Sequence, residues 1–194
     1  MNKRQQQKLE TRQKIRENAR QLFIEKGFEG ATSREIAKRS GVALGTLFVH
    51  FENKNDILDD ILYEDIEATV KESFISIDPQ NDIVSTLMHL ARSLYTYYES
   101  QIDLSRALLK NSLFQTSNST NFALQISAFI EAVTGLIEDA QKKGELRNDK
   151  NAKTMATAFM GSYFIVLIAL IRDESLNSML AIEQLEEQTR CILS

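Results

Sequence analysis

The residues that could carry chemistry in this chain are few and lie far apart. The two histidines, His50 and His89, and the single cysteine, Cys191, are too widely separated to match the ligand spacing of a zinc site. The sequence contains no G-x-S-x-G, no glycine-rich phosphate loop and no C-x-x-C motif. We therefore expect no enzyme activity, no cofactor and no metal. A single cysteine also favours a reducing, cytoplasmic setting.

The charged residues are unevenly distributed along the chain. Residues 1–54 carry 12 Lys or Arg against 6 Asp or Glu, whereas residues 55–194 carry 11 against 21. A basic N-terminal part on an acidic body favours a polyanionic partner bound at that end. A chance division of surface charges is the alternative.

Helical patterns with defined ends fill this basic part. Apolar residues at helical spacing predict a first helix over residues 11–26, which Gly27 can end because glycine adopts positive φ. Thr32 and Glu35 then match a capping box, in which each side chain accepts a hydrogen bond from the other residue's backbone amide. This pattern predicts a second, short helix over residues 33–39.

A glycine turn and a third helix follow directly. Gly41 interrupts the helical pattern, and the third helix is predicted over residues 44–50. Asn53 is placed to cap a fourth helix. Helix, glycine turn and helix in this order predict a helix-turn-helix. The third helix exposes a small face, which would let its backbone approach base edges in a major groove. The residues of that face are Ala43, Gly45 and Thr46.

The sequence from Thr11 to Leu58 resembles the N-terminal headpiece of the TetR family of transcription regulators. A weaker similarity covers residues 140–147, which resemble the helix end that precedes the dimerisation helices in that family. The positions that carry the headpiece resemblance are Leu22, Phe23, Lys26, Gly27, Phe28, Thr32, Ile36, Ala37, Gly41, Val42, Gly45, Thr46, Leu47, Phe48, Phe51 and Lys54.

The resemblance implies DNA contacts at nine positions of the headpiece. The implied phosphate contacts at the start of the second helix are Thr32 and Ser33. The implied base-reading positions are Ala43, Leu44, Gly45 and Thr46. The implied contacts to the DNA backbone are Phe48, His50 and Lys54.

Four of these positions depart from the family pattern. Ala43 and Leu44 stand where many members have serine and lysine, and Phe48 and His50 stand where tyrosine is frequent. Ala43 gives up a capping bond of about 1 kcal/mol, and Leu44 offers an apolar contact for a thymine methyl. Lys3 and Arg4, in the first nine residues, would compensate by following the DNA backbone or entering the minor groove. A disordered, solubilising tail is the alternative for this segment.

The rest of the chain reads as helices, which predicts an all-α fold. We expect a helix-turn-helix DNA-binding domain over residues 1–53 and a helical domain for effector binding and dimerisation over residues 54–194. The expected helices of the second domain cover residues 54–76, a helix started by Asp78 and Pro79, residues 104–114, residues 122–144, residues 151–172 with Asp149 as its cap, and residues 176–191.

Residues 154–171 carry no charge and reach the lower length limit of a membrane-spanning helix. Burial within an oligomer explains this segment better, because its first half is rich in small and polar residues. The resemblance implies that the last two helices of each subunit form the dimer. The predicted interface residues are Phe159, Tyr163, Val166, Leu170, Leu180 and Leu185.

Aromatic residues are frequent in the middle helices, and the resemblance implies an effector site there. Plain core packing is the alternative for such residues. His89, Arg92 and Arg106 are candidate polar anchors, although His89 also fits a satisfied structural histidine. The predicted ligand-binding residues are Ile66, Val70, Phe74, Leu90, Leu94, Tyr98, Leu109, Phe114 and Phe129.

Together these patterns predict a homodimeric, cytoplasmic transcription regulator. We expect a repressor that binds a palindromic operator in double-stranded DNA and is released by a small, largely apolar or aromatic ligand. A DNA-binding dimer without a small-molecule site, or a helical adaptor regulated by a protein partner, is the alternative.

Overall fold

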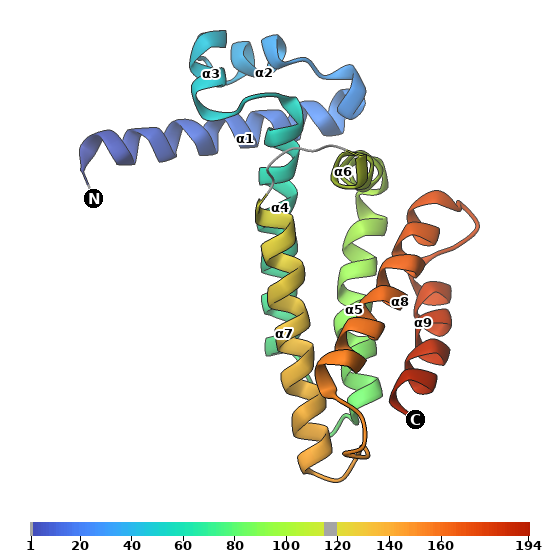
Figure 1. Ribbon diagram of the computed structural model, residues 1–194. Helices are drawn as coiled ribbons and strands as arrows, with labels where there is room; N and C mark the ends of the chain where they lie inside the picture. Colours follow the sequence, from blue (N-terminus) through green and yellow to red (C-terminus); the bar gives the residue numbers. More distant parts are fainter. Residues whose placement is uncertain (1, 115–119) are drawn as a thin grey trace. The chain divides into compact units, whose positions relative to one another are not determined.

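Helices make up the architecture of the chain (Figure 1). The computed structural model describes residues 2–114 and 120–194, with the side chains of residues 112–123 left aside. Within this described part there are nine helices and no strand, which confirms the predicted all-α fold.

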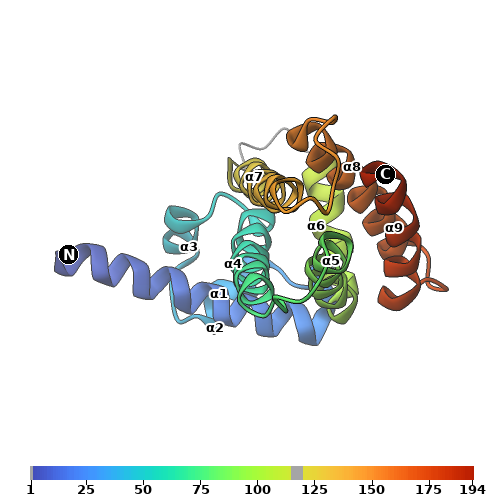
Figure 2. The ribbon, with the colours of Figure 1, turned by 90° about the horizontal axis from the view of Figure 1, so that it is seen from below.

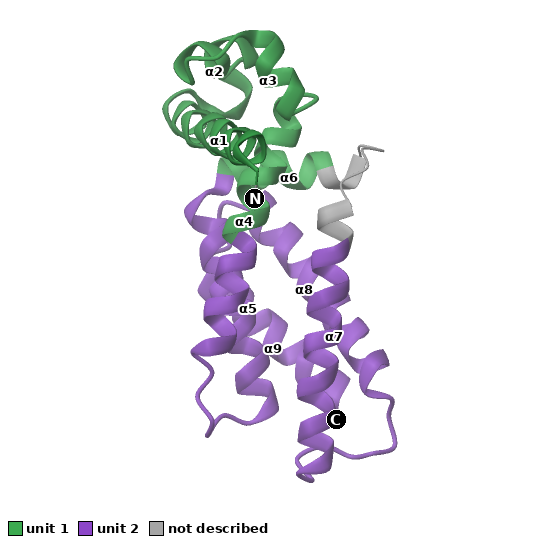
Figure 3. Cartoon of the chain, turned by 90° about the vertical axis from the view of Figure 1, so that its left-hand side faces the viewer, with its two compact units in different colours: residues 1–65, 103–116 green, residues 66–102, 117–194 purple. Residues whose placement is uncertain are grey.

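The chain forms two compact units, coloured separately in Figure 3. Unit 1 comprises residues 1–65 and 103–116, and unit 2 comprises residues 66–102 and 117–194. The helices of unit 1 are α1 (Lys3–Gly30), α2 (Ser33–Arg39), α3 (Leu44–His50), the first part of α4 (Lys54–Ile75) and α6 (Ile102–Phe114). The helices of unit 2 are the rest of α4, α5 (Ile83–Ser100), α7 (Thr120–Lys142), α8 (Ala152–Arg172) and α9 (Ser178–Leu193). A functional boundary after residue 53 stays a prediction.

The N-terminal helix differs most from expectation. Helix α1 begins at Lys3, well before the predicted start, because the side chain of Asn2 accepts a hydrogen bond from the Arg4 amide at 2.7 Å. Residues 3–9 are therefore helical, and not the disordered tail that the sequence left open. Gly27 has a φ of 71° and kinks the helix, which continues to Gly30.

Two helices of unit 2 have other N-cap residues than predicted. Helix α5 is capped by Asp82, whose carboxylate accepts from the Ser85 amide at 2.7 Å, so the expected start at Asp78 and Pro79 is wrong. Asp78 instead accepts from the Gln80 amide within the preceding turn. Helix α8 is capped by Asn151 and not by Asp149, which pairs with Arg147 at 2.7 Å.

Unit 2 is a bundle in which α8 packs against α7 and α9 (Figures 1 and 3). Its core contains stacked tyrosines: the rings of Tyr95 and Tyr163 lie 5.0 Å apart, and the Tyr95 hydroxyl donates to the Tyr163 carbonyl at 2.9 Å. Burial raises the pKa of both phenols, so they stay neutral. Helix α8 is long and apolar enough to cross a membrane, but half of its apolar window is buried within the protein. A core helix of a bundle has the same composition.

Candidate nucleic-acid interface

A tight turn between α2 and α3 sets the geometry of the headpiece. Gly41 has a φ of 65°, and its amide donates to the Lys38 carbonyl while the Val42 amide donates to the Ala37 carbonyl at 3.0 Å. These two bonds form a Schellman motif, which ends α2 and turns the chain at once into α3. Side chains other than glycine rarely adopt this φ, so the residue type is required by the turn.

The start of α2 has the predicted capping box. The Thr32 hydroxyl accepts from the Glu35 amide at 3.2 Å, and the Glu35 carboxylate accepts from the Thr32 amide at 3.1 Å. Lys26 adds an ion pair to Glu35 at 2.5 Å. The bond to Lys26, followed by the bonds to Thr32, lowers the pKa of Glu35 to about 2. The Thr32 hydroxyl is therefore engaged within the protein, and Ser33 beside it is half-buried.

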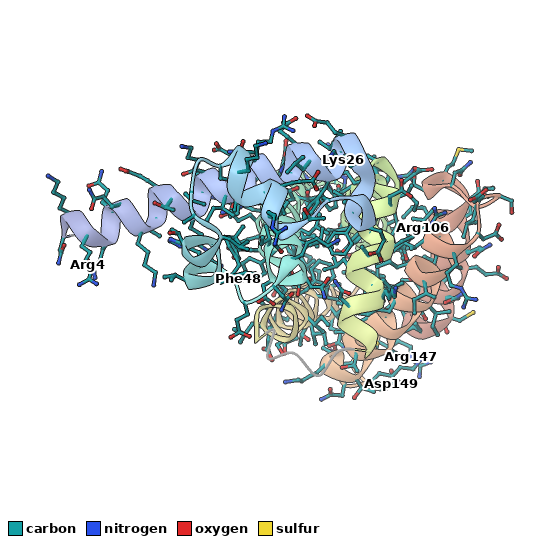
Figure 4. All side chains as sticks on the ribbon, turned by 90° about the horizontal axis from the view of Figure 1, so that it is seen from above. Arg4, Lys26, Phe48, Arg106, Arg147 and Asp149 are labelled. Atoms are coloured by element: carbon teal, nitrogen blue, oxygen red, sulfur yellow. The ribbon has the colours of Figure 1, made fainter. Side chains whose placement is uncertain are left out.

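Helix α3 presents the predicted reading face to solvent. Ala43, Gly45 and Thr46 are exposed, Leu44 is half-buried, and Ala43 makes no side-chain cap. The sequence did not single out Val49, whose exposed fraction is 71%; Phe48, labelled in Figure 4, is 47% exposed. Two adjacent large apolar side chains are thus open to solvent on the exposed side of α3, where they are available to contact a bound partner.

Lys54 is oriented differently from what the resemblance implies. Its ammonium donates to the carbonyls of Phe28 at 2.6 Å and Ala31 at 3.0 Å, and lies 4.2 Å from the centre of the Phe28 ring. These contacts fasten the start of α4 to the end of α1. A phosphate contact by Lys54 stays a prediction, and it would have to compete with these carbonyls.

An ion-pair ladder neutralises much of the basic headpiece. Three arginines of α1, one turn apart, face the acidic residues at the start of α4. Arg12 forms two bonds to Asp60, at 2.7 and 3.1 Å, and Arg20 forms two to Asp65, at 2.6 and 2.7 Å. Arg16 pairs with Glu64 and, at 3.4 Å, with Asp60. A count of charges along the chain places these carboxylates in the acidic body, so it overstates the positive charge of the N-terminal headpiece.

Six cations of unit 1 are exposed and form no ion pair in the described structure. They are Lys3, Arg4, Lys8, Lys14, Arg34 and Lys38. The first half of α1 projects beyond α3 in the two perpendicular views of Figures 1 and 2, and Arg4 lies near its free end (Figure 4). Together with the exposed face of α3, this projection gives unit 1 a surface that suits a polyanion.

His50 closes α3 and is half-buried. Burial lowers the pKa of its imidazole, and the nearby positive charges of Lys8 and Arg12 lower it further. The imidazole is therefore neutral at physiological pH, and it offers a hydrogen-bonding ring rather than a charge to a DNA backbone.

Asp59, in the first part of α4, has a carboxylate that is mostly buried and incompletely hydrogen-bonded. Its Oδ1 is buried with no hydrogen-bond partner in the described structure. Burial, with a smaller contribution from Asp56, raises the pKa of Asp59 to about 6. A raised carboxyl pKa means that the charged form costs stability, and that the cost disappears when the folded protein binds a proton.

The substitution Asp59→Asn should stabilise the protein at pH 7.5. We expect about 1–2 kcal/mol, after discounting the full shift because part of the carboxyl remains solvated. The gain should shrink as the pH falls below about 6 and vanish near the unfolded value of 3.8. Urea unfolding of both proteins between pH 4 and 8 measures it. Glu67→Gln, on the exposed side of the same helix, is the control, and equal gains for both would disprove the assignment.

The predicted effector residues divide between the two units. Ile66, Leu90, Leu94, Tyr98 and Phe129 are buried in unit 2, where the Phe129 ring lies 6.4 Å from that of half-buried Phe74. Val70 is half-buried in unit 2, whereas Leu109 belongs to α6 of unit 1, and the Phe114 side chain lies outside the described residues. His89 bonds to the Ser73 carbonyl and the Ser76 hydroxyl, both at 3.1 Å, so its role in the structure is to hold the end of α4. No metal-binding cluster occurs among the residues described.

The predicted dimer residues need a correction, because most of them face the interior of the protomer. Five are at most 4% exposed, and a partner could not reach their side chains without unfolding α8 or α9. These five are Phe159, Tyr163, Val166, Leu170 and Leu185. Leu180 is 39% exposed. The outward side of the same helices includes Ala158, Gly161, Ile165 and Met179.

Comparisons with known sequences find similarity to transcriptional regulators. Residues 15–61 match the model for "Bacterial regulatory proteins, tetR family". An HTH-type transcriptional regulator of Staphylococcus aureus is 36% identical over 64 residues, which span 33% of this chain and 35% of that protein. The HTH-type transcriptional regulator UidR of Escherichia coli K12 is 27% identical over 148 residues, which span 73% of this chain and 71% of UidR.

Solved structures share the fold over nearly the whole chain. FadR of Thermus thermophilus, a TetR family transcriptional repressor in complex with lauroyl-CoA, superposes with a TM-score of 0.75 at 23% identity, covering 94% of this chain and 93% of FadR. FadR of Bacillus subtilis, in complex with stearoyl-CoA, has a TM-score of 0.68 at 16% identity and covers 94% and 97%.

Proposed function

Because this chain belongs to the TetR family of transcriptional regulators, we propose that it is a homodimeric, cytoplasmic repressor that binds a palindromic operator. The observation that carries the proposal is the exposed face of α3 beside the unpaired cations of α1. The third helix of a helix-turn-helix reads base edges in the major groove, and neighbouring cations fix it on the phosphates. Two such helices in a dimer would read half-sites about 34–36 Å apart, or at a multiple of that distance.

The residues of the reading face have separate roles in this proposal. Gly45 and Thr46 let the backbone of α3 approach the bases, and Leu44, Phe48 and Val49 supply apolar contacts such as those made with thymine methyls. Few of these side chains donate hydrogen bonds. Affinity should therefore depend strongly on phosphate contacts and fall steeply with salt.

Neutralising the projecting half of α1 should weaken operator binding without changing the preferred sequence. In the triple variant Lys3→Gln, Arg4→Gln and Lys8→Gln we expect the slope of log K against log salt to fall by about 2–3, which is roughly one per lost phosphate contact. Fluorescence anisotropy with a labelled operator at several salt concentrations measures it. Lys142→Gln, on an exposed part of α7, is the control. An unchanged slope would remove α1 from the interface.

The second part of the proposal is a ligand of the fatty acyl-CoA class. It is supported by the two neighbouring structures that contain lauroyl-CoA and stearoyl-CoA, and by the aromatic, apolar interior of unit 2. Such a ligand would release the operator only if it binds the DNA-free arrangement more tightly than the DNA-bound one.

Thermal unfolding with lauroyl-CoA tests this part. A ligand at one hundred times its Kd should add about 2.7 kcal/mol to the stability of the folded state. Coenzyme A alone and laurate alone are the controls. No stabilisation by any acyl-CoA, together with no release of operator, would refute the ligand class while leaving DNA binding intact.

A further inference from the structure

The Arg12 side chain makes three different contacts at the junction of α1, α3 and α4. Its Nε and Nη2 bind the two oxygens of Asp60, and its Nη1 donates to the His50 carbonyl at 2.8 Å. The guanidinium also lies 4.2 Å from the centre of the Phe51 ring. Arg12 therefore connects the last residue of α3 to the first part of α4.

Helix α3 depends on contacts at its ends for its position. It has seven residues, and its cap, Ala43, provides no side-chain hydrogen bond. So short a helix has little stability of its own. The final carbonyls of a helix also lack partners within it. Arg12 satisfies the His50 carbonyl, and a bond from a charged donor is among the strongest that a carbonyl can accept.

The geometry favours a holding role for Arg12 over a direct contact with phosphate. Both of its outer nitrogens and Nε are already engaged, and Asp60 neutralises its charge. Lysine could not reproduce these contacts, because it has one nitrogen where the guanidinium presents a planar fork.

We propose that Arg12 is a positioning residue for DNA recognition, and that Asp60 acts through it. The Arg12–Asp60 pair holds the C-terminal end of α3 against the first part of α4. Operator affinity therefore depends on the Asp60 carboxylate, although Asp60 bonds to α1 and not to α3. The inference rests on the proposed function, because it assumes that α3 reads the operator.

Three variants of the full-length protein test it. Arg12→Lys keeps the charge and removes the fork, Asp60→Asn removes the carboxylate that Arg12 and Arg16 share, and the exchange Arg12→Asp with Asp60→Arg restores an α1–α4 ion pair without the bond to His50. Arg20→Lys is the matched control, because Arg20 makes the same two-bond pair with α4 through Asp65. The readouts are thermal unfolding, operator affinity with its salt slope, and hydrogen exchange of the α3 amides.

We expect Arg12→Lys to weaken operator binding roughly tenfold to a hundredfold, with the salt slope unchanged and faster exchange at the end of α3. The double variant Arg12→Asp with Asp60→Arg should not recover affinity, because it does not restore the bond to the His50 carbonyl. Arg20→Lys should keep both the operator affinity and the hydrogen-exchange rates of the α3 amides. The hydrogen-exchange measurement needs no DNA, so it separates failure of this inference from failure of the proposed function. Unchanged α3 exchange in Arg12→Lys, or a salt slope lower by about one, would overturn the proposal.

Discussion

Replacing Ile165 by glutamate is expected to split the proposed dimer and abolish tight operator binding. Ile165 is 67% exposed on α8, and Ala158 and Gly161 precede it on the same outward side. Small residues beside a large apolar one allow two helices to approach closely. A carboxylate there would lie buried and unpaired in the dimer, which costs several kcal/mol per copy.

The monomer would carry only one reading helix, so we expect operator affinity to fall by at least about a hundredfold. Sedimentation velocity gives the oligomeric state, and anisotropy gives the affinity. Ile75→Glu is the matched control, since Ile75 is 76% exposed at the end of α4. If Ile165→Glu stays dimeric while Ile75→Glu becomes monomeric, the proposed interface is wrong.

The features that could be predicted well from the sequence are those that depend only on residues a few positions apart. The capping box of Thr32 and Glu35 and the positive φ of Gly41 follow from local hydrogen bonding and sterics, and the structure contains both. Where several cap-forming residues stand close together, local reasoning failed. Asp78 and Asp82 are equivalent by type, and the structure has Asp82 as the cap of α5 while Asp78 accepts a bond within the preceding turn.

The ion pairs between α1 and α4 lay beyond sequence reasoning for another reason. Arg12 and Asp60 are 48 positions apart, and no local pattern specifies which face of one helix meets another. A count of charges along the chain therefore placed Asp60 in the acidic body, although in space it belongs to the headpiece. The contacts of Lys54 could not be predicted for the same reason, because the carbonyls of Phe28 and Ala31 that it binds lie more than 20 residues away in the sequence.

Helix α8 was ambiguous because its second half, residues 164–171, is apolar on every side. Periodicity locates a buried face only when the opposite face is polar. Here the inward residues, such as Phe159, and the outward residues, such as Ile165, are both large and apolar. Length and composition could therefore identify α8 as a core or interface helix but could not separate its two faces.

Substituting Phe159 by alanine should show whether the side of α8 that carries Phe159 packs within the protomer or against a partner. Phe159 is fully buried within unit 2, so we expect a loss of about 3–5 kcal/mol in the free energy of unfolding, from lost burial and from the cavity left behind. Urea unfolding at several protein concentrations measures it. Because the contacts lie within one protomer, the loss should be the same at each concentration, whereas a weakened dimer becomes more stable as the protein is concentrated. Ile24→Ala, at a side chain 66% exposed in α1, should change stability by less than about 0.5 kcal/mol. A concentration-dependent loss in Phe159→Ala would restore Phe159 to the dimer interface that the sequence first suggested.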